Sequence, residues 1–242
     1  MSDVVAPAPP PPPPPPPPSA PAAPTFDFVK PLTYVFDDPQ WIQKMLLGAL
    51  FSLASIILIG IFIVYGYMAR LVRQVIEGVE RPLPDWNNVG DYIGEGVKLF
   101  IATLLYGAPV FILIVLTIPF SIISDASNLD DAARFAGGAM SAGLGCLIGP
   151  LALMMAIWVP AALLRAMATG EFSAAFDFAA IAAFLKNNAI NYLLAYVVWI
   201  LARFVAGFGL LLCCVGVFVT AFWSMCVGAY AFAQTWRLAS VK

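Results

Sequence analysis

The stretch that decides the fold is "ERPLPDWNNVGDYIGEGVKLF" at residues 80–100, the longest polar segment between two strongly apolar blocks. Its two prolines favour extended geometry and lack an N–H donor. Unpaired backbone groups are costly in hydrocarbon, so such a segment stays out of the bilayer core. The stretch therefore predicts a built elbow at a membrane surface, joining two helices.

Single residues of the elbow predict where helices end and begin and where the chain meets the membrane surface. We expect the preceding helix to end at Gly78, because glycine adopts the left-handed conformation without a Cβ penalty. Trp86 is expected to anchor at the headgroup level. Asn88 is expected to cap the start of the next helix. Gly94 and Gly96 are expected to let this short interfacial helix turn into the following span.

The acids of the elbow allow two interpretations. Asp91 suits the first turn of a helix, where the dipole favours negative charge, and Glu95 can pair with Lys98 one turn on. Alternatively, Asp85, Asp91 and Glu95 could bind a divalent cation. We prefer the first interpretation, because no further converging ligand is visible, and we expect no metal site.

The composition is that of a polytopic membrane protein. The chain has 242 residues, 62% of them hydrophobic and 11% charged, against roughly 45–50% and about 25% in soluble domains. A net charge of -2 and the lack of any nucleic-acid motif exclude nucleic acid as an expected partner. The sequence has no His, which removes the commonest general base and metal ligand. The four Cys lack CxxC spacing, so we expect no enzyme activity and no cofactor.

The N-terminus reads "MSDVVAPAPPPPPPPPPP", which has neither the basic start nor the apolar core of a signal peptide. We predict that residues 1–25 form a disordered, proline-rich cytosolic tail. Its run of prolines favours polyproline II. The tail is either a stiff tether or a ligand for a proline-recognition partner.

Four apolar blocks follow the tail, and they predict an all-α polytopic membrane protein with about six hydrophobic helices. Two helical hairpins would flank two central spans kinked by prolines. We expect one helical membrane domain over 26–242, divided as follows: 26–77 first interfacial segment and hairpin; 78–97 interfacial elbow; 98–123 and 138–166 central spans; 171–188 interfacial segment; 189–236 second hairpin.

The hairpin prediction depends on the lengths of the first and last blocks. The last is long enough for two helices and should break at "AGFG", residues 206–209. The first, at 41–76, is either one long helix or a hairpin broken near 53–56. The hairpin is favoured because it puts most of the basic residues on one side, as the positive-inside rule requires. Its first arm is nevertheless short, so we expect that arm to enter obliquely. Both termini are then cytosolic.

An "FDF" triplet occurs at 26–28 and again at 176–178, each ahead of a hairpin block and followed by Lys44 or Lys186. This suggests an internal duplication. Pro109 with Pro119, and Pro150 with Pro160, predict kinks in the two central spans. Broken helices frame substrate sites in transporters, although kinks are also ordinary in membranes.

Two ridges of small residues predict faces for helix packing, within the chain or between copies. Arg203 lies deep in an apolar run. It is either a candidate buried charge with a partner or a side chain that snorkels to the outer surface. The two ridges are Gly137, Ser141, Gly145 and Gly149, and Gly216, Thr220, Ser224 and Gly228.

Three segments in order, "YVFDDPQWIQKMLLGAL" at 34–50, "GYMARLVRQVIEG" at 66–78 and "RPLPDWNNVGDYIGEGVKLF" at 81–100, resemble an uncharacterised prokaryotic membrane family, domain of unknown function 4013. The resemblance covers roughly residues 30–240, more loosely in the second half. It implies an integral membrane protein and no assigned activity. The family-motif residues are Asp38, Pro39, Trp41, Lys44, Gly66, Tyr67, Arg70, Pro82, Pro84, Trp86, Gly90 and Gly96.

The expected function is that of a structural scaffold or accessory subunit in the cell (inner or cytoplasmic) membrane of a prokaryote. Its expected partners are the lipid bilayer and other membrane subunits or copies of itself. The alternative is a small-solute or lipid permease. A water-accessible cavity lined by Thr103, Tyr106, Ser141 or Arg203 would favour the permease, and a packed interior would favour the scaffold.

Overall fold

The computed structural model describes residues 25–240, apart from the side chains of residues 212–215. Nearly all of the predicted tail at 1–25 lies outside this part. Within it, the all-helical prediction is confirmed. The helices are α1 Lys30–Thr33, α2 Trp41–Ala54, α3 Ile59–Glu77, α4 Val89–Asp125, α5 Asp131–Thr169, α6 Phe178–Asn187, α7 Ala189–Gly207 and α8 Cys213–Ser240; short 3₁₀ turns occupy Tyr34–Asp37, Ser55–Ile57, Trp86–Asn88, Phe172–Phe176 and Phe208–Leu212.

Five of the described helices are long and apolar enough to cross a membrane: α3, α4, α5, α7 and α8. The segments Lys30–Asp37 and Trp41–Ile57 would add a sixth only as one span bent by 109°. This agrees with the prediction of about six hydrophobic helices. With 14 residues, α2 is about 21 Å long, less than the roughly 30 Å of a bilayer core. By itself α2 is therefore too short to cross, so the predicted return of the chain at 55–58 depends on the oblique entry expected of this arm.

The first apolar block is interrupted rather than a single rod. After the turn at Ser55–Ile57, Leu58 has a positive φ of 68°, which ends the helical path. A Cβ on Gly60 would overlap the carbonyl oxygen of Phe51, so α3 starts directly against the end of α2. The predicted break near 53–56 thus lies within two residues of the observed turn.

The last block forms the predicted hairpin. Helix α7 ends at Gly207 and α8 begins at Cys213. The hydroxyl of Thr220 is 2.9 Å from the carbonyl oxygen of Ala206, and that of Thr235 is 3.2 Å from the carbonyl oxygen of Asn191. The two helices therefore pack antiparallel over most of their length.

The elbow is shorter than predicted. Gly78 ends α3 in the left-handed conformation, with φ 78°, as expected. However, α4 runs without a break from Val89 to Asp125, so no separate interfacial helix ends at Gly94 or Gly96. Gly96 serves another purpose: a Cβ there would overlap the carbonyl oxygen of Phe62, so the glycine lets α4 cross α3 closely.

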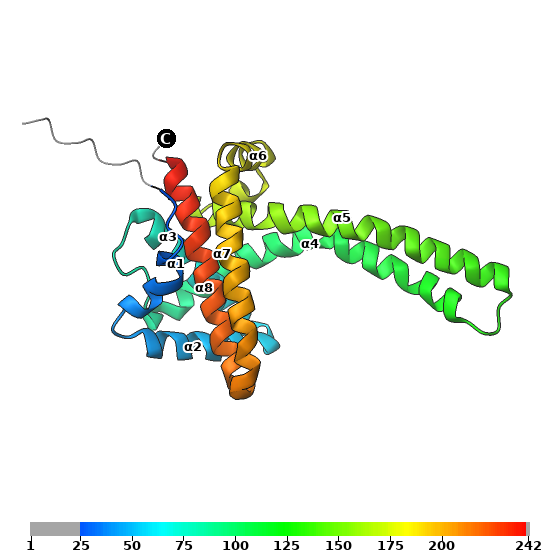
Figure 1. The fold of residues 1–242 in the computed structure, drawn as a ribbon, viewed down its shortest axis with the longest axis horizontal. Helices are drawn as coiled ribbons and strands as arrows, with labels where there is room; N and C mark the ends of the chain where they lie inside the picture. Colours follow the sequence, from blue (N-terminus) through cyan, green and yellow to red (C-terminus); the bar gives the residue numbers. More distant parts are fainter. Residues whose placement is uncertain (1–24, 241–242) are drawn as a thin grey trace, which may run out of the picture.

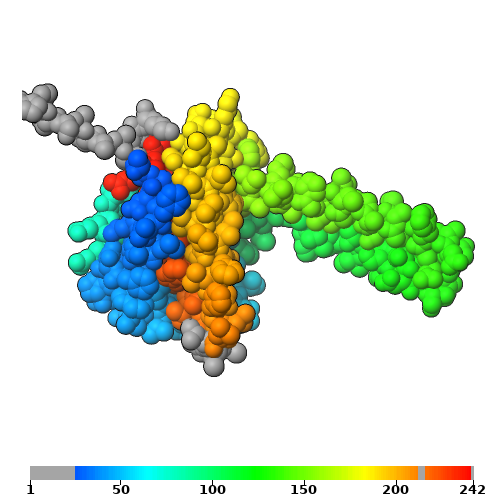
Figure 2. All heavy atoms as spheres, viewed as in Figure 1, coloured from blue at the N-terminus to red at the C-terminus, as the bar shows by residue number. Residues whose placement is uncertain are grey.

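The apolar residues of α3 are much more buried than those of α4 and α5. In α3, 56% of the most apolar stretch is buried, against 17% in α4 and in α5. Figure 1 shows α4 and α5 leaving the body side by side and running crosswise to α7 and α8, and Figure 2 shows their outer halves standing clear of the body. We call residues 107–154 the arm; the rest of the described chain is the body.

The two "FDF" triplets have similar local structures. Asp27 accepts hydrogen bonds from the backbone amides of Val29 and Lys30 at the start of α1. Asp177 accepts one from the amide of Ala180 at the start of α6. Each triplet thus lies at the start of a short helix, which is followed by a longer helix, a 3₁₀ turn and a second long helix. This similarity adds support to the internal duplication, which stays a hypothesis.

Candidate functional site

Several motif residues converge on the amino group of Lys44. Its Nζ atom lies 2.7 Å from a carboxylate oxygen of Asp38 and 2.7 Å from one of Asp85. It also donates to the carbonyl oxygen of Leu83 at 2.9 Å. We call these groups the Lys44 cluster. Because Lys44 is in the first turn of α2 and the other partners flank it in sequence or lie in the elbow, the cluster fastens the elbow to α2.

The ion pairs of the Lys44 cluster favour the charged forms of both Asp38 and Lys44. Burial opposes ionisation of Asp38, but hydrogen bonds from Lys44 and from the amide of Gln40 more than offset it, so its pKa lies below the ordinary 3.8. Burial likewise opposes the charge on Lys44, but hydrogen bonds to Asp38 and Asp85 outweigh it and raise its pKa above 10.5. At neutral pH Asp38 and Lys44 are therefore both charged.

Trp86 packs against aromatic side chains of the body. Its ring stacks on that of Tyr67 at a centroid distance of 4.2 Å, and Phe222 lies on the same aromatic cluster. Its Nε1 atom donates to the carbonyl oxygen of Lys44 at 3.1 Å. Trp86 is thus half-buried and joins the elbow to α3 and α8, and its place at the headgroup level stays a prediction.

Two further expectations about the elbow were wrong. Asn88 occupies the N-cap position of α4, but its side chain makes no capping hydrogen bond. Glu95 pairs with Arg73 of α3 rather than with Lys98, because the close crossing of α3 and α4 brings that guanidinium within reach. Asp85 is likewise bound to Lys44. In the described part of the chain, no three acidic, Cys or His side chains gather into a metal site.

The remaining motif residues divide between the interior and the surface. Gly66 and Gly96 form the crossing of α3 and α4, where a Cβ on Gly66 would overlap the backbone of Tyr92. Pro82 and Pro84 are buried, Trp41 is half-buried, and Pro39, Arg70 and Gly90 are exposed. Most of the motif therefore maintains the structure of the body, with Lys44 paired to Asp38.

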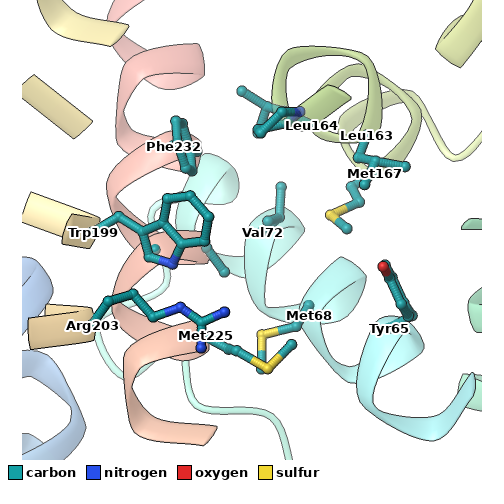
Figure 3. Close-up of a pocket in the computed structure, with 13 residues that line it drawn as sticks. Tyr65, Met68, Val72, Leu163, Leu164, Met167, Trp199, Arg203, Met225 and Phe232 are labelled. Carbon is teal, nitrogen blue, oxygen red and sulfur yellow. The ribbon is translucent and has the colours of Figure 1, made fainter. Parts of the chain in front are cut away.

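A second candidate site is a cavity of about 280 Å³ between α3, α5, α7 and α8. Figure 3 shows Arg203 and Trp199 on one side of it, Met68 and Val72 across from them, and Met167 beyond. Its lining also includes Met225 and Pro160. The walls are almost entirely apolar, and Arg203 is the one charged residue in the lining.

Arg203 is exposed within the described chain. Its guanidinium carbon lies 5.5 Å from the ring centre of Trp199, one turn towards the start of α7. The side chain thus lies over Trp199 on the side of α7 away from the turn at 208–212, and snorkelling to the outer surface stays a prediction. Within residues 25–240, no carboxylate lies within 4.0 Å of its nitrogen atoms, so the buried pair is not formed.

Pro160 frees backbone groups next to this cavity, and α7 satisfies them. A proline at this position removes the amide that would bond the carbonyl of Ala156. The hydroxyl of Tyr196 donates to that carbonyl. The hydroxyl of Tyr192 donates to the carbonyl of Ile157 at 2.7 Å. Pro160 therefore leaves no free carbonyl at these positions for an ion to bind.

The other residues expected to line a permease cavity lie elsewhere. Tyr106 donates to the carbonyl of Ala175 at 2.5 Å, under the turn before α6. Thr103 is 3.3 Å from the hydroxyl of Tyr65. Ser141 is 3.1 Å from Ser121 within the arm. Of the four expected lining residues, the cavity includes Arg203 alone.

The first ridge of small residues faces two environments. A Cβ on Gly137 would lie 2.7 Å from the side chain of Ile123, so this glycine packs against α4. Ser141 contacts Ser121 on the same helix pair. Gly145 and Gly149 have nothing within 4 Å of a Cβ, so they face no neighbour within the described chain.

The second ridge lies along the α7–α8 contact. Thr220 reaches Ala206 across that contact. A Cβ on Gly228 would overlap the indole ring of Trp199. Ser224 is fully buried, and Gly216 lies at the start of the ridge near the turn. This ridge therefore holds the second hairpin together.

Sequence reasoning missed the roles of Tyr192 and Tyr196. Their signal was present, because two tyrosines four residues apart in an apolar helix share one face and need partners for their hydroxyls. It also missed the Arg73–Glu95 pair, which depends on a crossing between helices that no local pattern reveals.

Comparison with known proteins gives one match. The family model described as "Protein of unknown function (DUF4013)" matches residues 49–239, well over half of the chain. This confirms the resemblance drawn from the motifs, although the match begins after the segment that contains Asp38 and Lys44. No curated protein and no solved structure was found to match.

Proposed function

We propose that this chain, which belongs to the DUF4013 family of unknown function, is a structural scaffold or accessory subunit of a membrane complex. It is an integral membrane protein by its helices. We further propose that it resides in the cell membrane of a prokaryote, with both termini in the cytosol.

The observation that carries the scaffold proposal is the arm. Helix α4 has 37 residues and is about 55 Å long, much longer than the roughly 30 Å bilayer core. Its buried residues stop at Tyr106. Those of α5, apart from Gly137, begin at Ala161. Beyond these points the two helices pack on each other and stand clear of the body (Figure 2), which suits a part that reaches another subunit.

The two helices of the arm pack on each other and leave an open outer surface. Gly137 and the contact between Ser121 and Ser141 join its two helices. On α5, Gly145 and Gly149 leave space for another helix backbone to approach closely. Close approach at small residues is how helices associate in lipid.

The orientation proposal rests on the positive-inside rule and on the contact between the start of α2 and the elbow. The Lys44 cluster holds the start of α2 beside the elbow that follows α3, as a fold-back of α2 and α3 requires. Near the end of α8, Arg237 approaches Gly78, to 3.1 Å from a Cβ built there. Arg237 thus lies beside the beginning of the elbow, whereas the start of α2 lies beside its later residues, Leu83 and Asp85.

The permease is the second candidate, and the cavity beside Pro160 favours it because Arg203 lines it. Two observations weigh against it. The carbonyls of Ala156 and Ile157 are taken by tyrosines. The cavity, at about 280 Å³, is at the lower limit of the roughly 300–1,000 Å³ of small-molecule sites.

The native Cys146 provides the test, because it is an exposed thiol on the arm. In a variant that keeps Cys146 and replaces the other three Cys by Ala, a short thiol-reactive cross-linker is applied to native membranes. The scaffold proposal expects a defined product, either with a second copy or with another subunit identified by mass spectrometry.

The matched control moves the sole thiol to the body as Ile190→Cys, whose parent side chain is 75% exposed. This variant is expected to give little of that product. Monomer alone from the Cys146 variant, under conditions where the thiol is fully modified by a monofunctional reagent, would overturn the proposal.

A further inference from the structure

The cavity between α3, α5, α7 and α8 holds an arginine without an acidic partner. A charged group set among apolar side chains costs several kcal/mol unless something compensates it. The Arg203 guanidinium has no carboxylate within ion-pair distance in the described part of the chain. Its nearest compensation is the face of the Trp199 ring. It can still donate several hydrogen bonds to an anion.

The position of the guanidinium is built by the surrounding residues. Trp199 supports it by a cation–π contact at 5.5 Å. The indole fits there because residue 228 is glycine, since any Cβ would overlap the ring. The sequence thus provides space on α8 for an aromatic side chain on α7, which in turn directs Arg203 into the cavity (Figure 3).

The rest of the cavity suits a flexible hydrocarbon chain. Met68, Met167 and Met225 come from three different helices and line it. Methionine side chains are unbranched and adapt to irregular apolar shapes. A volume of about 280 Å³ accommodates part of one apolar chain better than a hydrated polar solute.

We propose that this cavity binds an acyl-chain amphiphile with an acidic headgroup. The phosphate or carboxylate accepts hydrogen bonds from Arg203, and the acyl chain lies among the three methionines. An acidic phospholipid and a free fatty acid share this chemistry. The site is independent of the scaffold role proposed above, because it lies in the body and needs no second subunit.

The test uses fluorescence of the purified full chain in mild detergent. The probes carry bromine on the acyl chain, which quenches tryptophan at contact: a brominated phosphatidylglycerol, a brominated fatty acid and, as the neutral-headgroup comparison, a brominated phosphatidylcholine. We expect an acidic probe to quench the part of the tryptophan fluorescence that comes from Trp199, and this quenching should be absent in the Trp199→Phe variant. Phosphatidylglycerol alone, or the fatty acid alone, identifies which source the site accepts.

Three variants separate the contributions. Arg203→Met keeps the apolar volume and is expected to raise the half-quenching concentration of the acidic probe on the order of tenfold or more. Arg134→Met removes an exposed arginine of the arm and is expected to leave the half-quenching concentration of the acidic probe unchanged. Ala229→Leu fills the cavity with Arg203 intact and is expected to abolish the Trp199-dependent component.

Equal quenching of Trp199 by the phosphatidylcholine probe would overturn the proposal. So would an unchanged half-quenching concentration in Arg203→Met or in Ala229→Leu. If Arg203→Met does not fold, Ala229→Leu decides the question by itself.

Discussion

At the scale of single residues, Lys44 is the most consequential side chain of the body. Its amino group is bound to two carboxylates and one carbonyl, and it is 10% exposed. We expect Lys44→Met to destabilise the protein by about 3–5 kcal/mol, because it leaves Asp38 buried without its partner. Thermal unfolding in detergent measures the loss.

Lys30→Met is the matched control for this substitution. The side chains of the Lys30–Asp37 pair are 42% and 47% exposed, and exposed pairs contribute about 0–1 kcal/mol. Equal losses of stability in the two variants would mean that the Lys44 cluster does not hold the elbow.

The pKa shifts of the same pair predict a pH dependence. Asp38 has a lowered pKa in the folded protein, so its contribution is present above its ordinary value of 3.8 and is lost as pH falls through the folded pKa. Lys44 has a raised pKa, so its contribution is present below its ordinary value of 10.5 and is lost as pH rises through the folded pKa.

The melting temperature should therefore be flat around neutral pH and fall on both sides. The acid limb should be smaller in Asp38→Asn, which has no carboxylate to protonate at this position. An unchanged acid limb in Asp38→Asn would assign the acid sensitivity to other groups.

At the scale of helices, the crossing of α3 and α4 depends on glycine. Gly96→Ala would drive a Cβ into the carbonyl of Phe62. We expect a loss of about 1–3 kcal/mol, as in other overpacked interiors. Gly94→Ala is the control on the same helix, because nothing lies within 4 Å of its Cβ.

Gly94→Ala should stabilise α4 by about 0.5–1 kcal/mol, the helix preference of alanine over glycine. Thermal unfolding of both variants measures the contrast. If both shifted the melting temperature in the same direction, the close crossing of α3 and α4 would be contradicted.

The contact between α5 and α7 predicts a thermodynamic coupling. Tyr196→Phe leaves the carbonyl of Ala156 without the hydroxyl donor, which should cost about 1–3 kcal/mol. In a Pro160→Ala background the amide of residue 160 can bond that carbonyl, so the same change should cost less. A double-mutant cycle measures the difference, and additive effects would show that Tyr196 does not compensate for Pro160.

At the scale of the whole molecule, sequence patterns predicted the local events well. The end of α3 at Gly78, the break after α2 and the turn after α7 each follow from residues at those positions. The patterns failed wherever a partner came from a distant segment. Trp86 packs on Tyr67 and Phe222, and Glu95 pairs with Arg73, because α3, α4 and α8 meet there.

The candidate site was predicted only in part, because some of its contacts come from distant segments. Arg203 was identified because a charge in an apolar run is conspicuous in sequence. The direction of its side chain could not be predicted, because Trp199 on α7 and the space at Gly228 on α8 together determine it. The crosswise arm was also unpredictable, because hydropathy gives the length of α4 and α5 but not their direction.

The central claim is that the chain folds back at 55–58 and at 208–212, with both turns on one side of the membrane and the elbow on the other. The direct test is labelling by a membrane-impermeant maleimide in intact cells, with single cysteines in a chain whose own Cys are replaced by Ala. Ile56→Cys and Leu210→Cys, at positions 74% and 73% exposed, should react in intact cells, and Arg81→Cys only after permeabilisation. Reaction of Ile56→Cys and Arg81→Cys from the same side would contradict the claim.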